Sequence, residues 1–189
     1  MIVRRHRLII ALLLCFSCAV ARESTSDAAV ADSSGAIDAY FPPWDDAQKP
    51  LLAALDSART QVLVQAFLLT NRKIADSLIA AHRRGVDVRI LADARQHAEN
   101  PGSLLRVLVR AGVPVWLETR YKNAHNKVMV IDVAASDPAV ITGSFNFTWS
   151  AQNMNAENLL IIRGNAALAE RYASNWMRHR ADAQPLESR

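Results

Sequence analysis

A histidine and a lysine stand two residues apart at His125 and Lys127, in a stretch whose pattern predicts a strand. Residues two apart on a strand project from the same face, so an imidazole and an ammonium would lie side by side. The ammonium can neutralise a phosphate oxyanion while the imidazole acts as nucleophile or acid. The pair alone would also fit a solvated strand face, so the prediction of phosphate chemistry depends on the residues that follow.

Further groups suited to such chemistry follow along the chain. Gly143 and Ser144 end a predicted strand and open a turn, where backbone N–H groups can face an anion. The Ser144 hydroxyl and the Asn146 amide add hydrogen-bonding groups without charge. Glu157 begins the next predicted strand and could hold the second ring nitrogen of His125, fixing its tautomer. Singly, these could be a helix cap, a turn residue and a strand flank, but together they predict a catalytic set of His125, Lys127, Ser144, Asn146 and Glu157.

Six residues in this stretch resemble the signature of the phospholipase D superfamily, H-x-K-x4-D-x6-G-S-x-N, in type and order: His125, Lys127, Asp132, Gly143, Ser144 and Asn146. Ten residues rather than six separate Asp132 from Gly143, and the additional ones lie around positions 134–138, where we expect a hairpin turn. An even insertion shared by two paired strands lengthens a hairpin without turning side chains to the other face. We therefore expect the two halves of the signature to remain together.

The resemblance covers about residues 36–180 and is to the short bacterial nuclease of that family. It implies a phosphodiesterase that needs no metal and no cofactor, in which the histidine attacks phosphorus and water then resolves a phosphohistidine. A chain with one signature would have to form a homodimer with a shared active site. One His125 must then be neutral to attack while the other is protonated to serve as acid. Because imidazoles titrate near neutrality, we expect a broad optimum at mildly acidic to neutral pH.

Asp132 and the nearby cations receive different predictions. Asp132 is seven residues from His125, and this odd spacing turns it to the opposite face of a straight strand, so we expect a structural salt bridge there. Gly143 is likewise assigned to the structural part of the motif. Arg120 and Lys122 lie close in sequence to His125, and we expect them to bind substrate together with Lys127 and Asn146.

No metal site is expected. The histidines outside the signature, His82, His97 and His179, lack metal-ligand spacing. Asp87 and Asp93 flank a strand without further carboxylates nearby.

Three functions remain open, and we rank them by the local chemistry. An endonuclease acting on DNA or RNA comes first, because the chain is short, carries one signature and has cations beside it. A phospholipase D-type phospholipid hydrolase comes second, with an apolar rim from Phe145, Phe147 and Trp149. Trp149 could instead be a core or interface aromatic. A non-catalytic dimeric binding module comes last.

The elements that must position this set alternate between strand and helix and then change character. Strands are predicted near residues 37–41, 62–67, 86–90 and 113–117, with helices between them. A hairpin of strands at 127–133 and 139–142, a strand at 158–162 and a helix at 168–179 follow. This order predicts a single α/β domain over residues 37–180, with a mixed β-sheet flanked by helices. The resemblance implies that this is the phospholipase D/nuclease fold.

The first residues are expected to lie outside the domain. Residues 1–21 combine a basic start, an apolar run and small residues, which predicts a secretory signal peptide and a secreted or periplasmic protein. An uncleaved anchor and a lipoprotein site at Cys18 are weaker readings. Residues 22–36 read as a flexible leader and 181–189 as a tail, with no stable membrane span after cleavage. Cleavage would remove three arginines and both cysteines, so the net charge of +4 says little about nucleic acid.

The composition agrees with a folded domain. Hydrophobic residues make up 51% of the chain and the mean hydropathy is +0.03, which excludes a disordered chain and a polytopic membrane protein.

Overall fold

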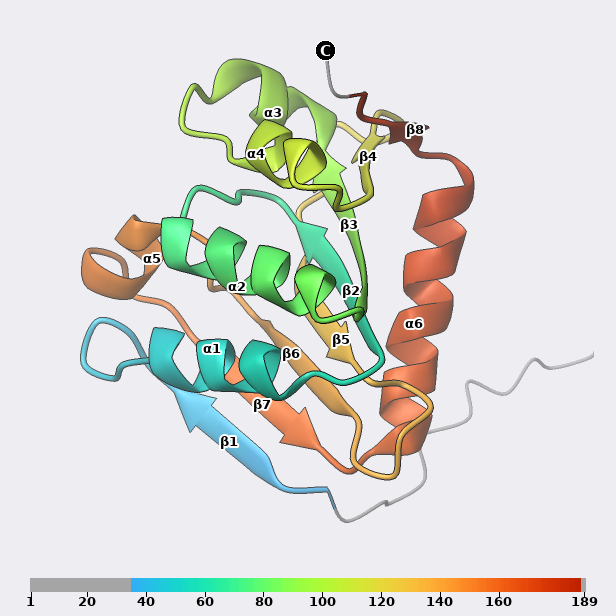
Figure 1. Ribbon diagram of the computed structural model, residues 1–189. Coiled ribbons are helices and arrows are strands. Elements are labelled where there is room, and N and C mark those ends of the chain that lie inside the picture. Colours follow the sequence, from blue (N-terminus) through green and yellow to red (C-terminus); the bar gives the residue numbers. More distant parts are fainter. Residues whose placement is uncertain (1–34, 188–189) are drawn as a thin grey trace, which may run out of the picture.

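The computed structural model describes residues 35–187, so the predicted signal peptide, nearly all of the predicted leader and the last two residues of the predicted tail lie outside the described residues. One sheet of eight strands in the order β1-β7-β6-β5-β2-β3-β4-β8 forms its centre (Figure 1). The strands are β1 (Ile37–Tyr40), β2 (Gln61–Ala66), β3 (Asp87–Asp93), β4 (Val115–Glu118), β5 (Lys127–Ile131), β6 (Ala139–Gly143), β7 (Leu159–Arg163) and β8 (Gln184–Pro185). Strands β2, β3 and β4 are parallel and the other pairs antiparallel, which confirms the predicted mixed sheet.

Helices cover both faces of this sheet. They are α1 (Gln48–Ser57), α2 (Arg72–Arg83), α3 (Ala94–Glu99), α4 (Leu105–Arg110), α5 (Trp149–Asn153) and α6 (Ala166–Ala181). Figure 1 shows α1 and α2 across one face and α6 along the other. Between residues 35 and 187, no helix has the length and apolar content needed to cross a lipid bilayer.

The two faces of the sheet each bury their own apolar cluster. Along β2, Val62 and Val64 pack on the side of α1 and α2, while Leu63 between them packs on the side of α6. Alternate residues of a strand point to opposite faces, so a strand covered on both sides is apolar throughout. On the α6 side, Trp176 is buried and its Nε1 donates a hydrogen bond to the Val64 carbonyl oxygen at 2.9 Å.

The β5–β6 hairpin carries the insertion that distinguishes this chain from the family signature. Ile131 pairs with Ala139 and Val128 with Thr142, so residues 132–138 form the connecting loop. One step further along the same register, Lys127 lies opposite Gly143. The additional residues therefore sit in the loop and leave the two halves of the motif at the same edge.

Three short elements are absent from the prediction. Helices α3 and α5 have six and five residues, which is too short for a helical periodicity to show in the sequence. Each begins at a side-chain cap, since Asp93 accepts from Gln96 N and Thr148 accepts from Ala151 N. Strand β8 lies in the predicted tail and pairs with β4.

Candidate active site

His125 and Lys127 meet on the ring of Phe67, where β5 begins and β2 ends. Phe67 N donates to Asn126 O at 2.9 Å, which extends the β2–β5 pairing toward His125. The exposed His125 ring lies 4.4 Å from the Phe67 ring, centroid to centroid, and the Lys127 ammonium lies 4.7 Å from the same centroid. The two side chains therefore share one aromatic platform. Phe67 is a member of the site that the sequence pattern did not single out, because it reads as the last residue of an apolar strand.

Lys127 is the most perturbed group of the site. Its side chain is only 5% exposed, and its ammonium donates to the His125 carbonyl oxygen at 2.7 Å. Burial lowers the pKa of Lys127 to about 8, and the nearby Glu157 carboxylate opposes this by favouring the charged form. With this pKa, Lys127 stays protonated below about pH 8, and a nearby anion extends the pH range in which it is charged.

Glu157 binds Ser144 rather than the His125 ring that we expected it to hold. Ser144 Oγ donates to Glu157 Oε2 at 2.5 Å, and Asn155 Nδ2 donates to Glu157 Oε1 at 2.9 Å. The reason lies in the sheet order: Gly143 of β6 pairs with Leu159 of β7, so residues just beyond these strand ends face each other. Glu157 thus positions the Ser144 hydroxyl and supplies negative charge near Lys127.

The backbone N–H groups after Gly143 do not form the anion site that the sequence suggested. Ser144 N and Phe145 N both donate to Asn158 O, at 3.1 and 3.3 Å. Gly143 permits this approach, because it has φ of +153° and a Cβ there would lie 2.3 Å from Asn158 O. Gly143 is therefore structural, and the hydroxyl of Ser144 faces the site in place of the N–H groups.

Asn146 brings an unpaired polar atom to the same loop. Its Oδ1 is buried and has no hydrogen-bond partner within residues 35–187. Buried polar atoms are nearly always paired, so a bound group is the natural partner for this amide. Phe145 and Phe147 on either side are fully buried, which removes them from the apolar rim considered for a lipid substrate. Trp149 of the same trio is 61% exposed.

Asp132 lies at the opposite end of β5 and is held by hydrogen bonds, not by the salt bridge we expected. Its carboxylate accepts from the backbone N–H groups of Arg59, Thr60 and Gln61 and from the Thr60 hydroxyl, at 2.7 to 2.9 Å. Burial alone would raise the pKa of Asp132, but these hydrogen bonds outweigh it and lower the pKa. Asp132 has φ of +54°, so it leaves the strand direction at once, and the parity argument for a straight strand does not apply to it.

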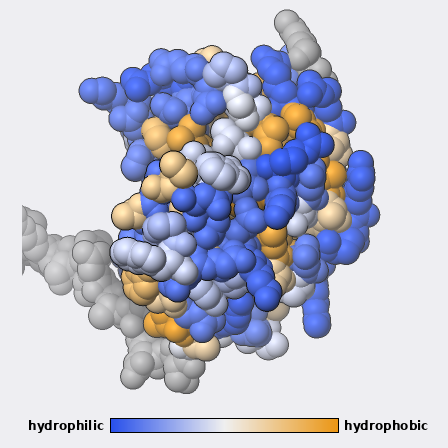
Figure 2. Space-filling model, turned by 90° about the vertical axis from the view of Figure 1, so that its left-hand side faces the viewer, coloured by the Kyte–Doolittle hydropathy of each residue, from blue (hydrophilic) through white to orange (hydrophobic). Residues whose placement is uncertain are grey.

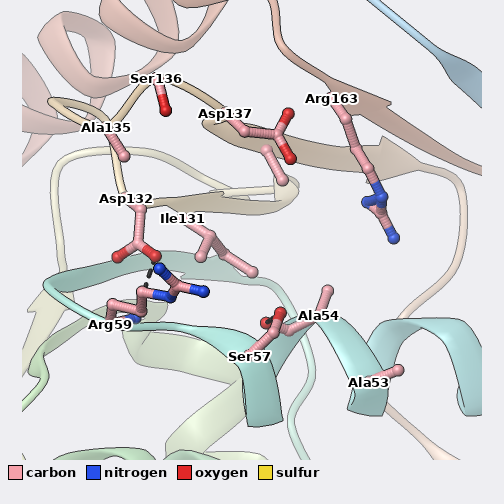
Figure 3. A pocket seen from close by; sticks show the side chains of 11 residues that line it. Ala53, Ala54, Ser57, Arg59, Ile131, Asp132, Ala135, Ser136, Asp137 and Arg163 are labelled. Atoms are coloured by element: carbon pink, nitrogen blue, oxygen red, sulfur yellow. Dashed lines mark hydrogen bonds between the residues drawn. The ribbon is translucent and has the colours of Figure 1, made fainter.

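The cavity beside Asp132 is separate from the catalytic edge. It measures about 600 Å³ and is lined by Arg59, Arg163 and Asp137 among others, as Figure 3 shows. Its walls come from the end of α1, the β5–β6 loop and the end of β7, whereas His125 and Lys127 lie at the other end of β5. Asp132 is therefore a structural member of the motif that ties the turn before β2 to the end of β5.

Asp93 fixes the chain immediately before His125, a role that the sequence did not indicate. It ends β3 with only 1% of its side chain exposed. Its Oδ2 accepts from Ala124 N at 2.6 Å and its Oδ1 from Gln96 N at 2.7 Å. One carboxylate thus joins the start of α3 to the residue that precedes the histidine.

The predicted substrate-binding cations are not all directed to the histidine. Arg120 forms an ion pair with Asp182 beyond the end of α6 and lies 6.0 Å from the Tyr121 ring. Lys122 is exposed on the loop that leads to His125. Within residues 35–187, no three His, Cys, Asp or Glu side chains converge in a way that could hold a metal ion.

Comparisons with known proteins extend over most of the chain. Residues 51–179 match the family model described as "Cardiolipin synthase, PLD-like domain". The chain is 37% identical over 149 residues to "Phospholipase D" of Rickettsia bellii, which covers 79% of this chain and 71% of the relative. It is 34% identical over 121 residues to "Mitochondrial cardiolipin hydrolase" of Xenopus laevis, covering 64% of this chain and 55% of that one. The solved structure of Nuc from Salmonella typhimurium, a phospholipase D family member, superposes with a TM-score of 0.76 at 30% identity, over 82% of this chain and 99% of that one.

Proposed function

The chain belongs to the phospholipase D superfamily of phosphodiesterases, and from this premise we propose that it is a metal-independent endonuclease that works through a phosphohistidine at His125. The observation that supports the reaction best is the joint placement of His125 and the buried Lys127 on the Phe67 ring. This arrangement puts a nucleophile and a desolvated cation beside one phosphate, which is what displacement at phosphorus requires.

The first half of the reaction breaks one ester bond. A ring nitrogen of neutral His125 attacks phosphorus, and the leaving ester oxygen takes a proton from the protonated His125 of the partner subunit. Lys127 and Ser144 lie where they can stabilise charge on the non-bridging oxygens. In the second half, a water gives its proton to that same acid-base histidine and attacks the phosphohistidine. The products are a phosphomonoester and free His125.

The need for a second copy follows from where the other histidines lie. His97 Nδ1 is 2.8 Å from Ser103 Oγ, and His179 Nδ1 is 2.5 Å from Glu118 Oε1 on the side of α6. His82 lies on α2 against Gly112. Residues 35–187 thus bring one histidine to the site, while the double displacement uses a nucleophile and an acid. We propose that a homodimer supplies the second as His125 of the partner subunit.

Nucleic acid is the proposed substrate because two of the three aromatic residues of the expected apolar rim are buried. Phe145 and Phe147 are 0% exposed and cannot contact acyl chains. The likeness to Nuc spans 99% of that chain, which supports a proposal based on a chain of similar extent. The side of the molecule seen in Figure 2 is mostly hydrophilic, with smaller apolar areas between the polar ones.

A phospholipid is the second candidate, and a specific surface favours it. Phe41, Trp44 and Met154 are 51%, 85% and 69% exposed. Their segments lie side by side next to the site, since Glu157 N donates to Pro42 O and Gln152 Nε2 donates to Asp45 O. Exposed apolar side chains beside a phosphate site could enter a lipid surface. Relatives named phospholipase D and cardiolipin hydrolase add weight to this candidate.

A substrate panel in EDTA tests both candidates. Purified protein is offered plasmid DNA, RNA, phosphatidylcholine and cardiolipin, with His125→Ala as the matched control. We expect nucleic acid cleavage to persist in EDTA and to fall at least about 10³-fold in His125→Ala. Cleavage of lipid in preference to nucleic acid by orders of magnitude would establish the second candidate instead. Loss of all activity in EDTA would refute the metal-independent mechanism.

A further inference from the structure

A groove of about 550 Å³ lies beside the catalytic edge, within the size range of small-molecule sites. It lies between α5, the N-terminal end of α2 and the segment that enters α1. An aromatic side chain, two cations, one carboxylate, one hydroxyl and several amides line it, among them Trp149, Arg72, Lys73, Asp46, Thr70 and Gln48.

Two paired segments connect this groove to the catalytic side chains. Leu69 and Phe147 form a parallel bridge, Phe147 N donates to Leu68 O at 3.1 Å, and Phe147 O accepts from Thr70 N at 3.0 Å. One segment runs from Phe67 to Thr70 and the other from Asn146 to Trp149, three residues in each case. Three residues span at most about 10 Å. A ligand in the groove can therefore belong to the same polymer as a phosphate at His125.

Trp149 offers a bare aromatic face at this distance. It is the first residue of α5 and is 61% exposed, although its backbone is firmly placed. The Thr148 cap holds Ala151 N at 3.1 Å, and Asn153 Nδ2 donates to Trp149 O at 2.8 Å. A nucleobase stacks on such a ring without regard to sequence, because every base has an aromatic face.

The walls of the groove are braced by amide side chains. Asn71 Nδ2 donates to Gln48 Oε1 at 2.5 Å, and Gln48 N donates to Gln152 Oε1 at 3.0 Å. Within residues 35–187, Gln48 Nε2, the Thr70 hydroxyl and Asn153 Oδ1 have no hydrogen-bond partner in the protein. These donors and acceptors suit the edge of a base, which presents both kinds of group.

Two cations at the start of α2 complete the set. Lys73 is exposed, and in the described part of the chain its ammonium has no ion pair. Arg72 is held through its Nε by Asp76 at 3.0 Å, which leaves its terminal nitrogens to donate elsewhere. Ammonium and guanidinium groups beside a stacking ring are the usual combination for a single strand, where the backbone and the bases are bound separately.

We propose that this groove binds one nucleotide of a single-stranded nucleic acid, with the base stacked on Trp149 and its phosphate facing Lys73 and Arg72. The nucleotide in the groove lies beside the phosphate that His125 attacks, so the groove positions the substrate strand at the active site. A base must be unpaired to stack on Trp149, so the groove favours single-stranded over duplex substrate. The inference takes its ligand class from the proposed nuclease function, and a binding experiment separates the two.

The test measures binding of a fluorescent oligothymidylate to His125→Ala protein, which does not cleave the probe. We expect Trp149→Ala to weaken binding by about 5-fold to 150-fold and Trp149→Phe to restore most of it. Trp44→Ala is the matched control, since Trp44 is more exposed than Trp149 but does not line the groove. Lys73→Gln should lower the salt dependence of binding by about 0.7 in the logarithmic slope. An oligonucleotide of abasic sites should bind Trp149→Ala and its parent alike.

Equal binding by Trp149→Ala and Trp44→Ala, or an effect that persists with the abasic probe, would overturn the assignment. So would a loss of binding to cardiolipin vesicles in Trp149→Ala without a loss for the oligonucleotide, because the groove would then take lipid. If the protein cleaves no nucleic acid but Trp149→Ala still weakens base-dependent binding, the groove stands and the proposed nuclease function fails. If the protein cleaves nucleic acid but Trp149→Ala does not weaken binding, the proposed nuclease function stands and the assignment of the groove fails.

Discussion

Lys127 shows the opposing demands of stability and activity on one side chain. Burial lowers its pKa to about 8, which means that the folded protein releases this proton more readily than the unfolded chain does. Below pH 8 the protein therefore carries a buried charge at a cost in stability, and this cost fades as the pH rises toward the ordinary lysine pKa. The charge is kept at neutral pH because pH 7 lies below the lowered pKa of Lys127.

Activity should consequently fall on the alkaline side as Lys127 loses its proton. We expect kcat/KM to decline as the pH rises through about 8, and Lys127→Met to lose about 10²–10³-fold at pH 7. The free energy of unfolding of the same variant should be at least as large as that of the parent at pH 7. The difference between the two should shrink toward pH 10. Rate profiles and urea unfolding across this range measure both effects. A rate that stays level to pH 10 would contradict the role of the charge, and a variant less stable at every pH would contradict its cost.

The sequence located the reacting side chains better than their contacts. Spacing alone brought His125 and Lys127 to one side, because a two-residue period holds wherever the backbone is extended. It could not show that Glu157 binds Ser144, since this depends on which strand lies next to β6. Phe67 was missed for a related reason: its ring closes the site only once β2 and β5 are neighbours.

At the scale of elements, Asp132 anchors the turn between α1 and β2 to the end of β5. Four hydrogen bonds reach its carboxylate, three of them from consecutive backbone N–H groups. We expect Asp132→Asn to lower the free energy of unfolding by about 1–3 kcal/mol with little change in kcat, because an amide nitrogen cannot accept these bonds. Urea unfolding and steady-state rates measure the two effects.

The pH dependence of this loss has a definite sign. The lowered pKa of Asp132 means that its contribution is present above the ordinary carboxyl pKa and disappears as the pH falls through the folded-state value. The gap between parent and variant should therefore close in acid. Asp137→Asn in the same loop is exposed and serves as control, with an expected change within about 0.5 kcal/mol. A gap that is constant down to pH 3 would exclude the charged carboxylate as its source.

Asp93 links a second pair of elements, and we expect it to act on catalysis through the backbone. It holds Ala124 N, so its loss should free the loop that ends at His125. We expect Asp93→Asn to lower kcat about 10-fold to 10²-fold while KM stays near the parent value, because a small displacement of the nucleophile acts on the transition state. Asp87→Asn on the same strand is the control, since Asp87 pairs with Arg89 at the surface. A rise in KM without a fall in kcat would point to substrate binding instead.

Elements were predicted well where the pattern was long. The apolar runs of β2 and β7 and the apolar faces of α2 and α6 extend over several residues. Their hydrophobic pattern is therefore long enough to distinguish strand from helix. Helices α3 and α5 were missed because one turn of helix carries no period and depends on the caps Asp93 and Thr148. Strand β8 depends on β4 being available at the sheet edge, which local sequence does not encode.

At the scale of the whole molecule, the mixed sheet followed from the order of elements, but the completeness of the site did not. Strands β2 to β4 alternate with helices and must be parallel, while the hairpin β5–β6 must be antiparallel. The exposed His125 and the paired Ser144 then lie along one edge, with the buried and unpaired Oδ1 of Asn146 in the same loop as Ser144. A site open on one side and holding one histidine is what a two-fold partner would complete.

Mixed dimers provide the sharpest test of this arrangement. If each active site needs both copies of His125, a dimer of one parent and one His125→Ala chain is inactive. An equal mixture, unfolded and refolded together, should then retain about a quarter of the parent activity, because only dimers of two parent chains work. Independent sites would retain about half. Light scattering on the same sample reports the mass, and an active monomer would remove the shared site altogether, leaving the acid to be found on the chain that carries the nucleophile.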